Sequence, residues 1–245
     1  PFQVGEYISA DGIDGTVAVQ AAHSERETDF LLELAAQHDF IRGVVGWVDL
    51  QSPQIEARLA HYAQSPKLKG VRHIVQDEAD PAFMQRPAFV RGIEALEKHD
   101  LTYDILVFHH QLPSAIQLIS DFPEQRFVLD HLGKPAIAKG AMQPWARHIR
   151  ELAARENVCC KISGMVTEAD WRNWRATDFT PYLDAVFEAF GAERILYGSD
   201  WPVCLLAADY RAVRQIVADS LAALSPAEQD GIWGGNAVRF YRLCE

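Results

Sequence analysis

Short apolar runs recur along the chain, and each is followed by a segment whose apolar residues have helical spacing. The runs are rich in Val, Ile and Leu and do not alternate with polar residues, which is typical of strands buried on both faces of a parallel sheet. We expect seven strands, at residues 15–21, 43–50, 70–74, 101–108, 127–131, 158–163 and 195–199.

Capping residues and prolines predict where the intervening helices begin. Ser24-Glu25-Arg26-Glu27 has the spacing of a capping box and should open a helix that runs to Ala36. Ser52-Pro53 should open the next helix, to about residue 64, because proline suits a first helical turn. Further helices are expected at 87–99, 113–122, 144–155, 181–191 and 210–224, with two short ones opening at Ser225 and Asn236.

Strand and helix alternate without a long linker, which predicts a single α/β domain over residues 1–245 with a parallel sheet. A (β/α)8 barrel needs about 250 residues and eight strands. Because the chain opens at Pro1 and offers seven strands, we expect a distorted TIM-like barrel that is truncated before its first strand. An open, doubly wound sheet is the alternative, although no G-x-G-x-x-G follows the first expected strand.

Charge and composition narrow the class of partner. The chain has 23 Lys and Arg against 34 Asp and Glu, a net charge of −11, and no basic run. These features argue against binding to nucleic acid or to an anionic membrane surface. No apolar run reaches the roughly 18 residues of a membrane span, and no signal peptide is visible. The four cysteines form no C-x-x-C pair, so we expect reduced thiols in a cytoplasmic protein.

Polar side chains collect directly after the expected strands, where the active site of a barrel forms. Five of the nine histidines lie in this layer, and the other four (His38, His61, His99 and His148) fall within or at the ends of helices, where we expect surface or boundary positions. The strand-end residues are Gln20, His23, Trp47, Asp49, Arg72, His73, Tyr103, Asp104, His109, His110, Asp130, His131, Lys134, Lys161, Ser163, Ser199, Asp200 and Trp201.

Asp200 and His131 are the candidate catalytic pair. A carboxylate beside a neutral imidazole can take a proton from water, either directly or from a metal-bound water. The same two residues are the candidate metal ligands, although a zinc site needs more than two. Arg72 could hold a substrate oxygen or carboxylate through its fork of donors. No G-x-S-x-G elbow is present, which disfavours a serine hydrolase.

Each of these residues also has a purely structural interpretation. A single histidine after a strand is usually a loop residue, and Asp200 could cap the turn into the next helix. Lys161 could form an ion pair inside the sheet, and Trp201 could simply pack. The joint pattern is therefore more informative than any one residue.

Six ordered segments resemble the amidohydrolase superfamily, and most closely its sugar-lactonase branch, which includes L-fuconolactonase and L-rhamnonolactonase. The segments are GVRHIVQDE (70–78), LTYDILVFHHQLP (101–113), FVLDHLGKP (127–135), KISGMVTEADW (161–171), ILYGSDWPV (195–203) and IWGGNAVRFYRL (232–243). The resemblance covers nearly the whole chain.

The resemblance implies a distorted (β/α)8 barrel in which Asp200 activates water and His131 is a metal ligand or positions the water. The substrate-binding residues would be Arg72, His73, Tyr103, His109, Ser163 and Trp201, largely from their strand-end positions. The resemblance implies either that one divalent metal ion takes part, with zinc preferred, or that catalysis needs no metal. The family's H-x-H motif does not occur in the chain, and we attribute this to truncation before the first strand.

The leading hypothesis is hydrolysis of a sugar lactone to the sugar acid in carbohydrate catabolism, by a monomer or homodimer. His73, Arg72 or a bound cation would stabilise the oxyanion. A second hypothesis is a metal-assisted hydrolase or decarboxylase of a small aromatic or pyrone carboxylic acid. Such a substrate calls for several arginines, and only Arg72 directly follows a strand. A third is an inactive remnant or binding protein.

Overall fold

The computed structural model describes residues 12–243. Seven strands form one parallel sheet whose spatial order follows the chain. They are β1 (Thr16–Val19), β2 (Ile41–Gly46), β3 (Leu68–Ile74), β4 (Thr102–Leu106), β5 (Phe127–Leu129), β6 (Val158–Ile162) and β7 (Ile195–Tyr197). All seven expected strands are confirmed, with ends that differ by at most four residues.

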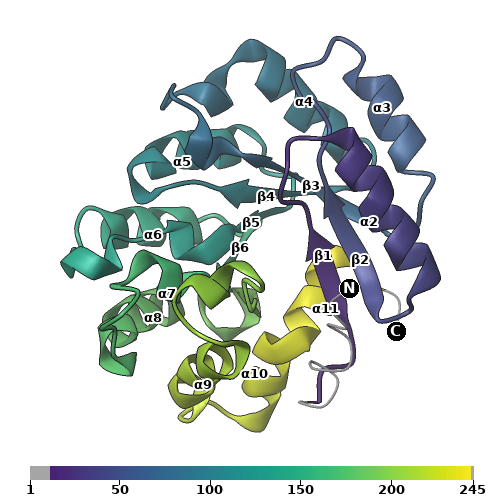
Figure 1. The fold of residues 1–245 in the computed structure, drawn as a ribbon. Helices are drawn as coiled ribbons and strands as arrows, with labels where there is room; N and C mark the ends of the chain where they lie inside the picture. Colours follow the sequence, from purple (N-terminus) through teal and green to yellow (C-terminus); the bar gives the residue numbers. More distant parts are fainter. Residues whose placement is uncertain (1–11, 244–245) are drawn as a thin grey trace.

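The sheet curls into an open half-barrel with helices on its outer side (Figure 1). Within residues 12–243, β7 does not pair with β1. In a doubly wound sheet the order of the strands reverses at a switch point. The order β1 to β7 follows the chain without a reversal and excludes that alternative. The architecture is that of a distorted TIM-like barrel. No helix of the described residues has the length and apolar character needed to cross a membrane.

Ten helices cover the described part of the sheet, and the expected ones are confirmed within a few residues. They are α2 (Glu25–Gln37), α3 (Ile55–Tyr62), α4 (Pro87–Glu97), α5 (Leu112–Asp121), α6 (Trp145–Ala153), α7 (Met165–Glu168), α8 (Ala176–Phe190), α9 (Tyr210–Leu221), α10 (Pro226–Asp230) and α11 (Asn236–Tyr241). The one-turn helix α7 was not expected, because four residues are too few for a hydrophobic period to appear.

Three local predictions are wrong. Neither half of the expected capping box forms: Ser24 makes no side-chain capping bond, and the Glu27 carboxylate accepts hydrogen bonds from the backbone of Ala21 and Ala22. Helix α8 begins five residues before Pro181, so this proline lies inside the helix. His148 is buried on the inner face of α6 and is not a surface residue.

Two apolar clusters hold the elements together. The larger one lies between the sheet and the surrounding helices. In the smaller one, Phe240 and Tyr241 of α11 pack against Val45, Val128 and Leu196 from three different strands. Residues of β2, β5 and β7 therefore face a common interior that α11 occupies, and Figure 1 shows α11 beside β1.

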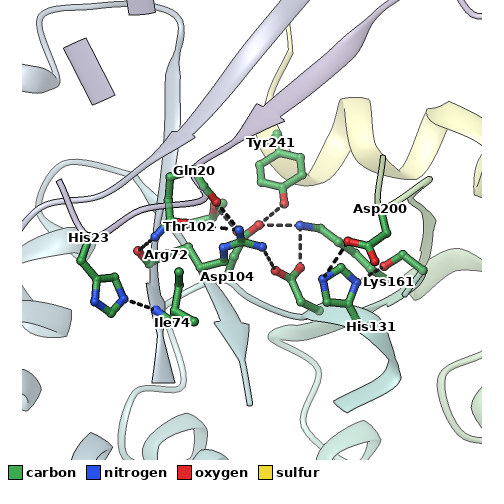
Figure 2. A network of polar contacts seen from close by, with 12 residues as sticks. Gln20, His23, Arg72, Ile74, Thr102, Asp104, His131, Lys161, Asp200 and Tyr241 are labelled. Carbon is green, nitrogen blue, oxygen red and sulfur yellow. Dashed lines mark hydrogen bonds and ion pairs between the residues drawn. The ribbon is translucent and has the colours of Figure 1, made fainter. Parts of the chain in front are cut away.

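A buried charge network crosses this interior beside Tyr241 of α11 (Figure 2). Lys161 on β6 places its Nζ 2.5 Å from Asp104 Oδ2 and 2.7 Å from Asp130 Oδ1. Arg72 on β3 places Nη1 2.8 Å from Asp130 Oδ2. The Tyr241 hydroxyl donates to Asp104 Oδ2 at 2.6 Å. The network therefore links β3, β4, β6 and α11 to the turn that follows β5.

The charges in this network balance, with two carboxylates against two cations. Burial alone would raise the pKa of Asp130, but Lys161 and Arg72 hold it well below its ordinary value. Burial alone would lower the pKa of Lys161, but Asp104 and Asp130 raise it. The buried charges of Asp130 and Lys161 are therefore stabilised by their partners and become costly without them, whereas burial raises the pKa of Asp104.

We expect Lys161→Met to lower the free energy of unfolding by about 3–5 kcal/mol, because two buried carboxylates would lose their shared cation. Urea denaturation at pH 7 measures this loss. Lys139→Met is the matched control, since Lys139 is exposed, and it should change stability by less than about 0.5 kcal/mol. Equal urea midpoints for the two variants would contradict a structural role for the network.

Candidate active site

Asp200 and His131 face each other at the carboxyl ends of β7 and β5. His131 Nε2 lies 3.5 Å from Asp200 Oδ1, and both side chains are 12% exposed. Both residues have φ of 55°, a left-handed backbone conformation that is uncommon outside glycine and concentrates at functional sites. The expected juxtaposition of these two residues is therefore present, and Figure 2 shows it.

The turn after β5 directs the His131 side chain toward Asp200. Left-handed conformations at His131, Leu132, Gly133 and Lys134 turn the chain sharply. Asp130 enters the charge network while the next residue faces Asp200. The network and the catalytic candidate are thus adjacent in sequence and in space.

Two residues of the segment directly after β6 hold the imidazole. His131 Nδ1 lies 2.8 Å from Ser163 Oγ. Gly164 lies against the ring, and a Cβ built on it would come within 2.6–2.8 Å of three His131 side-chain atoms. Gly164 also has φ of 62°, so both space and backbone conformation call for glycine.

Burial shifts the pKa of the two facing groups in opposite directions. It lowers the pKa of His131 to about 3, although the neighbouring Asp130 acts in the opposite sense. It raises the pKa of Asp200 to about 6, against the opposing effect of Lys134. At neutral pH the imidazole is therefore uncharged and the carboxylate is ionised. A carboxylate with a pKa near neutrality is suited to general-base work.

Lys134 and Glu168 form the rim beside Asp200. Lys134 Nζ lies 3.4 Å from Glu168 Oε1 and 5.2 Å from the centre of the Phe108 ring. Sequence reasoning placed Lys134 in the strand-end layer without a role and did not single out Glu168. The signal for Lys134 was its position three residues after His131 in the same turn.

The other predicted substrate residues take different positions. The Arg72 guanidinium is occupied by Asp130 and Gln20, and Tyr103 is fully buried between Phe89 and Phe127. Neither placement favours contact with substrate. His109 Nδ1 lies 3.1 Å from the Lys134 carbonyl oxygen. Substrate roles for His109, Ser163 and Trp201 stay predictions.

A second cluster lies at the ends of β1, β2 and β3. Trp47 Nε1 donates to His73 Nδ1 at 3.2 Å, and His73 Nε2 lies 2.8 Å from Glu78 Oε1. The His23 ring stacks on His73 with centroids 4.0 Å apart. Of this cluster, sequence reasoning gave a substrate role to His73 alone.

Two groups of side chains could hold a divalent metal ion. The ligand atoms of His23, His73 and Glu78 lie within 4.8 Å of one another. The facing atoms of His131 and Asp200 are 3.5 Å apart, and two ligands of one tetrahedral zinc ion lie roughly 3.4 Å apart. The Ser163 hydroxyl can accept a hydrogen bond from Nδ1–H, which leaves the Nε2 lone pair directed at Asp200. His131 and Asp200 therefore fit as two zinc ligands.

Comparison with known proteins places this geometry in a family. A Burkholderia multivorans protein named L-fucono-1,5-lactonase is 46% identical over 256 residues, covering 100% of this chain and 86% of the relative. A Burkholderia ambifaria protein of the same name is 38% identical over 247 residues, covering 99% and 85%.

The fold matches as well. The crystal structure of an amidohydrolase from Burkholderia multivorans with bound zinc has a TM-score of 0.94 and 44% identity, covering 98% of this chain and 87% of that one. The family model described as amidohydrolase matches residues 4–243. The chain belongs to the amidohydrolase family.

Proposed function

We propose that this protein is a lactonase, which opens a sugar lactone to the sugar acid by attack of an activated water on the ring carbonyl. The observation that carries the proposal is the ionised Asp200 carboxylate, with its pKa raised to about 6, facing the neutral His131 imidazole. The two relatives named L-fucono-1,5-lactonase support a 1,5-lactone of a six-carbon sugar acid as the substrate class.

In the proposed mechanism Asp200 takes a proton from water as the water oxygen bonds to the lactone carbonyl carbon. The carbonyl becomes a tetrahedral oxyanion. Its collapse breaks the ring C–O bond, and protonated Asp200 returns the proton to the leaving ring oxygen. The products are a free hydroxyl and a carboxylic acid, which ionises at neutral pH. His131 borders the reacting atoms, and Ser163 and Gly164 keep its ring in place.

Positive charge for the oxyanion comes most naturally from Lys134. Its ammonium is close enough to Asp200 to lower the pKa of that carboxyl. Arg72, which the sequence also suggests for stabilising the oxyanion, is already neutralised by Asp130 inside the barrel. A zinc ion held by His131 and Asp200 would supply Lewis-acid polarisation of the carbonyl and a water of lowered pKa.

The alternative substrate class, a small carboxylic acid, is less well supported. A carboxylate substrate needs cations that are free to meet it. Arg72 and Lys161, two cations inside the barrel, are already paired with Asp130 and Asp104. These pairings favour a neutral lactone.

We expect Asp200→Asn to lower kcat at least 100-fold, the lower range for loss of a general base. Assays should use a panel of aldono-1,4- and aldono-1,5-lactones, corrected for spontaneous hydrolysis. Asp184→Asn on the exposed face of α8 is the matched control and should keep full activity. If the Asp200 variant retained activity within a few-fold of the wild type, another residue would have to be the base.

The pH dependence should report the same carboxylate. Because the base must be deprotonated, kcat/KM should rise with pH through about 6 and level off above it. A profile of kcat/KM from pH 4.5 to 8 measures this limb. A flat profile across that range would show that no group with such a pKa controls the reaction.

The Asp200→Asn substitution should stabilise the fold at alkaline pH. The folded-state pKa of Asp200, about 6, exceeds the ordinary value of about 3.9. The folded state therefore binds this proton more tightly, and the stability conferred by Asp200 falls as pH rises from about 4 through 6. Asparagine does not titrate and tolerates a left-handed backbone.

Calorimetry at pH 8 should thus show a higher Tm for Asp200→Asn than for the wild type, by roughly 2–4 °C per kcal/mol gained. The difference should shrink at pH 5. A Tm difference that is the same at both values would mean that burial of this carboxylate carries no cost.

The packing of Gly164 against His131 gives a test of ring position. Alanine at residue 164 would contact the ring and should lower kcat at least 10-fold. Gly140→Ala is the matched control, because Gly140 has φ of 60° with nothing within 4 Å of an added Cβ. Both variants incur the left-handed cost of about 1–2 kcal/mol, which thermal melts would confirm. Full activity in Gly164→Ala would show that the His131 ring need not be held.

A further inference from the structure

We infer that His23 and Glu78 form a subsite that binds hydroxyl groups of the substrate, on the β1–β3 side of the mouth. The inference rests on the proposed lactonase function, which it deepens by naming residues that recognise the polyhydroxylated ring. The subsite is not the pair that performs the chemistry. Its residues follow other strands and have a different set of partners.

The position of the subsite places it at the same mouth as Asp200. His23 follows β1, Trp47 follows β2, and Glu78 follows the turn after β3. The carboxyl ends of parallel strands all lie at one end of a curled sheet. In Figure 2, Arg72 and Lys161 lie between His23 on one side and Asp200 on the other. A small ring bound above the charge network would have one group on each side.

The hydrogen bonds of the two histidines determine which nitrogen carries a proton. Trp47 Nε1 can only donate, so His73 Nδ1 must accept with its lone pair. Burial lowers the pKa of His73, and the neutral ring then carries its proton on Nε2 and donates it to Glu78. Likewise the Ile74 backbone N–H donates to His23 Nε2 at 2.8 Å, which leaves the proton of a neutral His23 on Nδ1.

This arrangement works against a metal ion in the His23, His73 and Glu78 cluster, even though the ligand atoms are close together. A metal needs a lone pair from each imidazole. Here both lone pairs are already used by the N–H donors of Trp47 and Ile74. The contrast with His131 is direct, because the hydroxyl partner of His131 can also accept a hydrogen bond and so leave the Nε2 lone pair free.

The hydrogen-bonding capacity that remains suits a diol. His23 Nδ1–H is a donor on an exposed ring, and Glu78 Oε2 is an acceptor on a side chain that is 27% exposed. Neither atom has a hydrogen-bond partner among residues 12–243. One sugar hydroxyl can accept from the imidazole while its neighbour donates to the carboxylate.

The rest of the cluster keeps these two groups rigid. The His73 ring is stacked between His23 at 4.0 Å and Phe83 at 4.8 Å. His73 also holds Glu78 Oε1, so the carboxylate is oriented before any ligand arrives. Trp47 stacks on His23 at 5.7 Å and adds an aromatic surface beside the two polar atoms. Preorganisation of this kind lowers the entropic cost of binding.

The kinetic test compares two lactones, a polyhydroxylated aldono-1,5-lactone and unsubstituted δ-valerolactone. Glu78→Gln should lower the ratio of kcat/KM for the hydroxylated lactone to that for δ-valerolactone by about 10- to 100-fold, the range for a hydrogen bond to a charged group. His23→Phe should lower the same ratio by about 2- to 10-fold, the range for a hydrogen bond between neutral groups. Glu94→Gln, on the exposed face of α4, is the matched control and should leave the ratio unchanged. An unchanged ratio in both test variants would overturn the subsite.

Two binding measurements separate this inference from the proposed function. Calorimetry with the corresponding aldono-1,5-lactam, a poorly hydrolysed analogue, should show about tenfold weaker binding to Glu78→Gln in an Asp200→Asn background. Zinc titration of the full chain should give the same affinity for the wild type and Glu78→Gln. If the Glu78 variant alone lost zinc, the cluster would be a metal site and the inference would fail. If the lactam bound as expected but no lactone were opened, the lactonase function alone would fail.

Discussion

The pairing of Asp130 with Lys161 and Arg72 is the interaction on which the site depends. It joins β3 and β6 to the turn after β5, and Asp104 and Tyr241 extend it to β4 and α11. Because His131 is the next residue after Asp130, the ion pairs that anchor Asp130 also fix the backbone from which the imidazole projects. A buried charge is costly unless it is paired, so the network leaves this turn little freedom to move.

The catalytic candidates themselves are placed at a cost to the fold. Asp200 and His131 both have left-handed backbones, and burial shifts the pKa of each away from its charged form. The same burial makes the chemistry feasible, because it gives a base near neutrality beside an uncharged imidazole. The stability that such a site gives up must come from elsewhere. The apolar cluster around α11 is one place where this structure supplies it.

Strand positions and the end of the sheet that carries the polar layer were predictable, because doubly buried parallel strands leave unbroken apolar runs. The strand-end positions of Asp200 and His131 also predicted correctly that the two residues lie close together. Strand-end position could not say which way each side chain points. Arg72 near the end of β3 turns inward to Asp130, and Tyr103 lies in the core because it stands at the amino end of β4. Left-handed turns leave no periodic trace, and neither do the backbone N–H donors that the Glu27 carboxylate finds in the loop after β1.

The two sides of the mouth differ in the proton chemistry they allow. At His131 the partner is a hydroxyl, which can donate or accept, so the imidazole can present either a proton or a lone pair toward Asp200. At His73 and His23 the partners are an indole and a backbone N–H, which can only donate and therefore hold one tautomer. One side can exchange protons with a reacting group and the other can only recognise fixed donors and acceptors. A neutral, hydroxylated ring with one electrophilic carbonyl needs both proton exchange at the carbonyl and recognition of its hydroxyl groups. The two sides of the mouth differ in this way because their imidazoles have different hydrogen-bond partners.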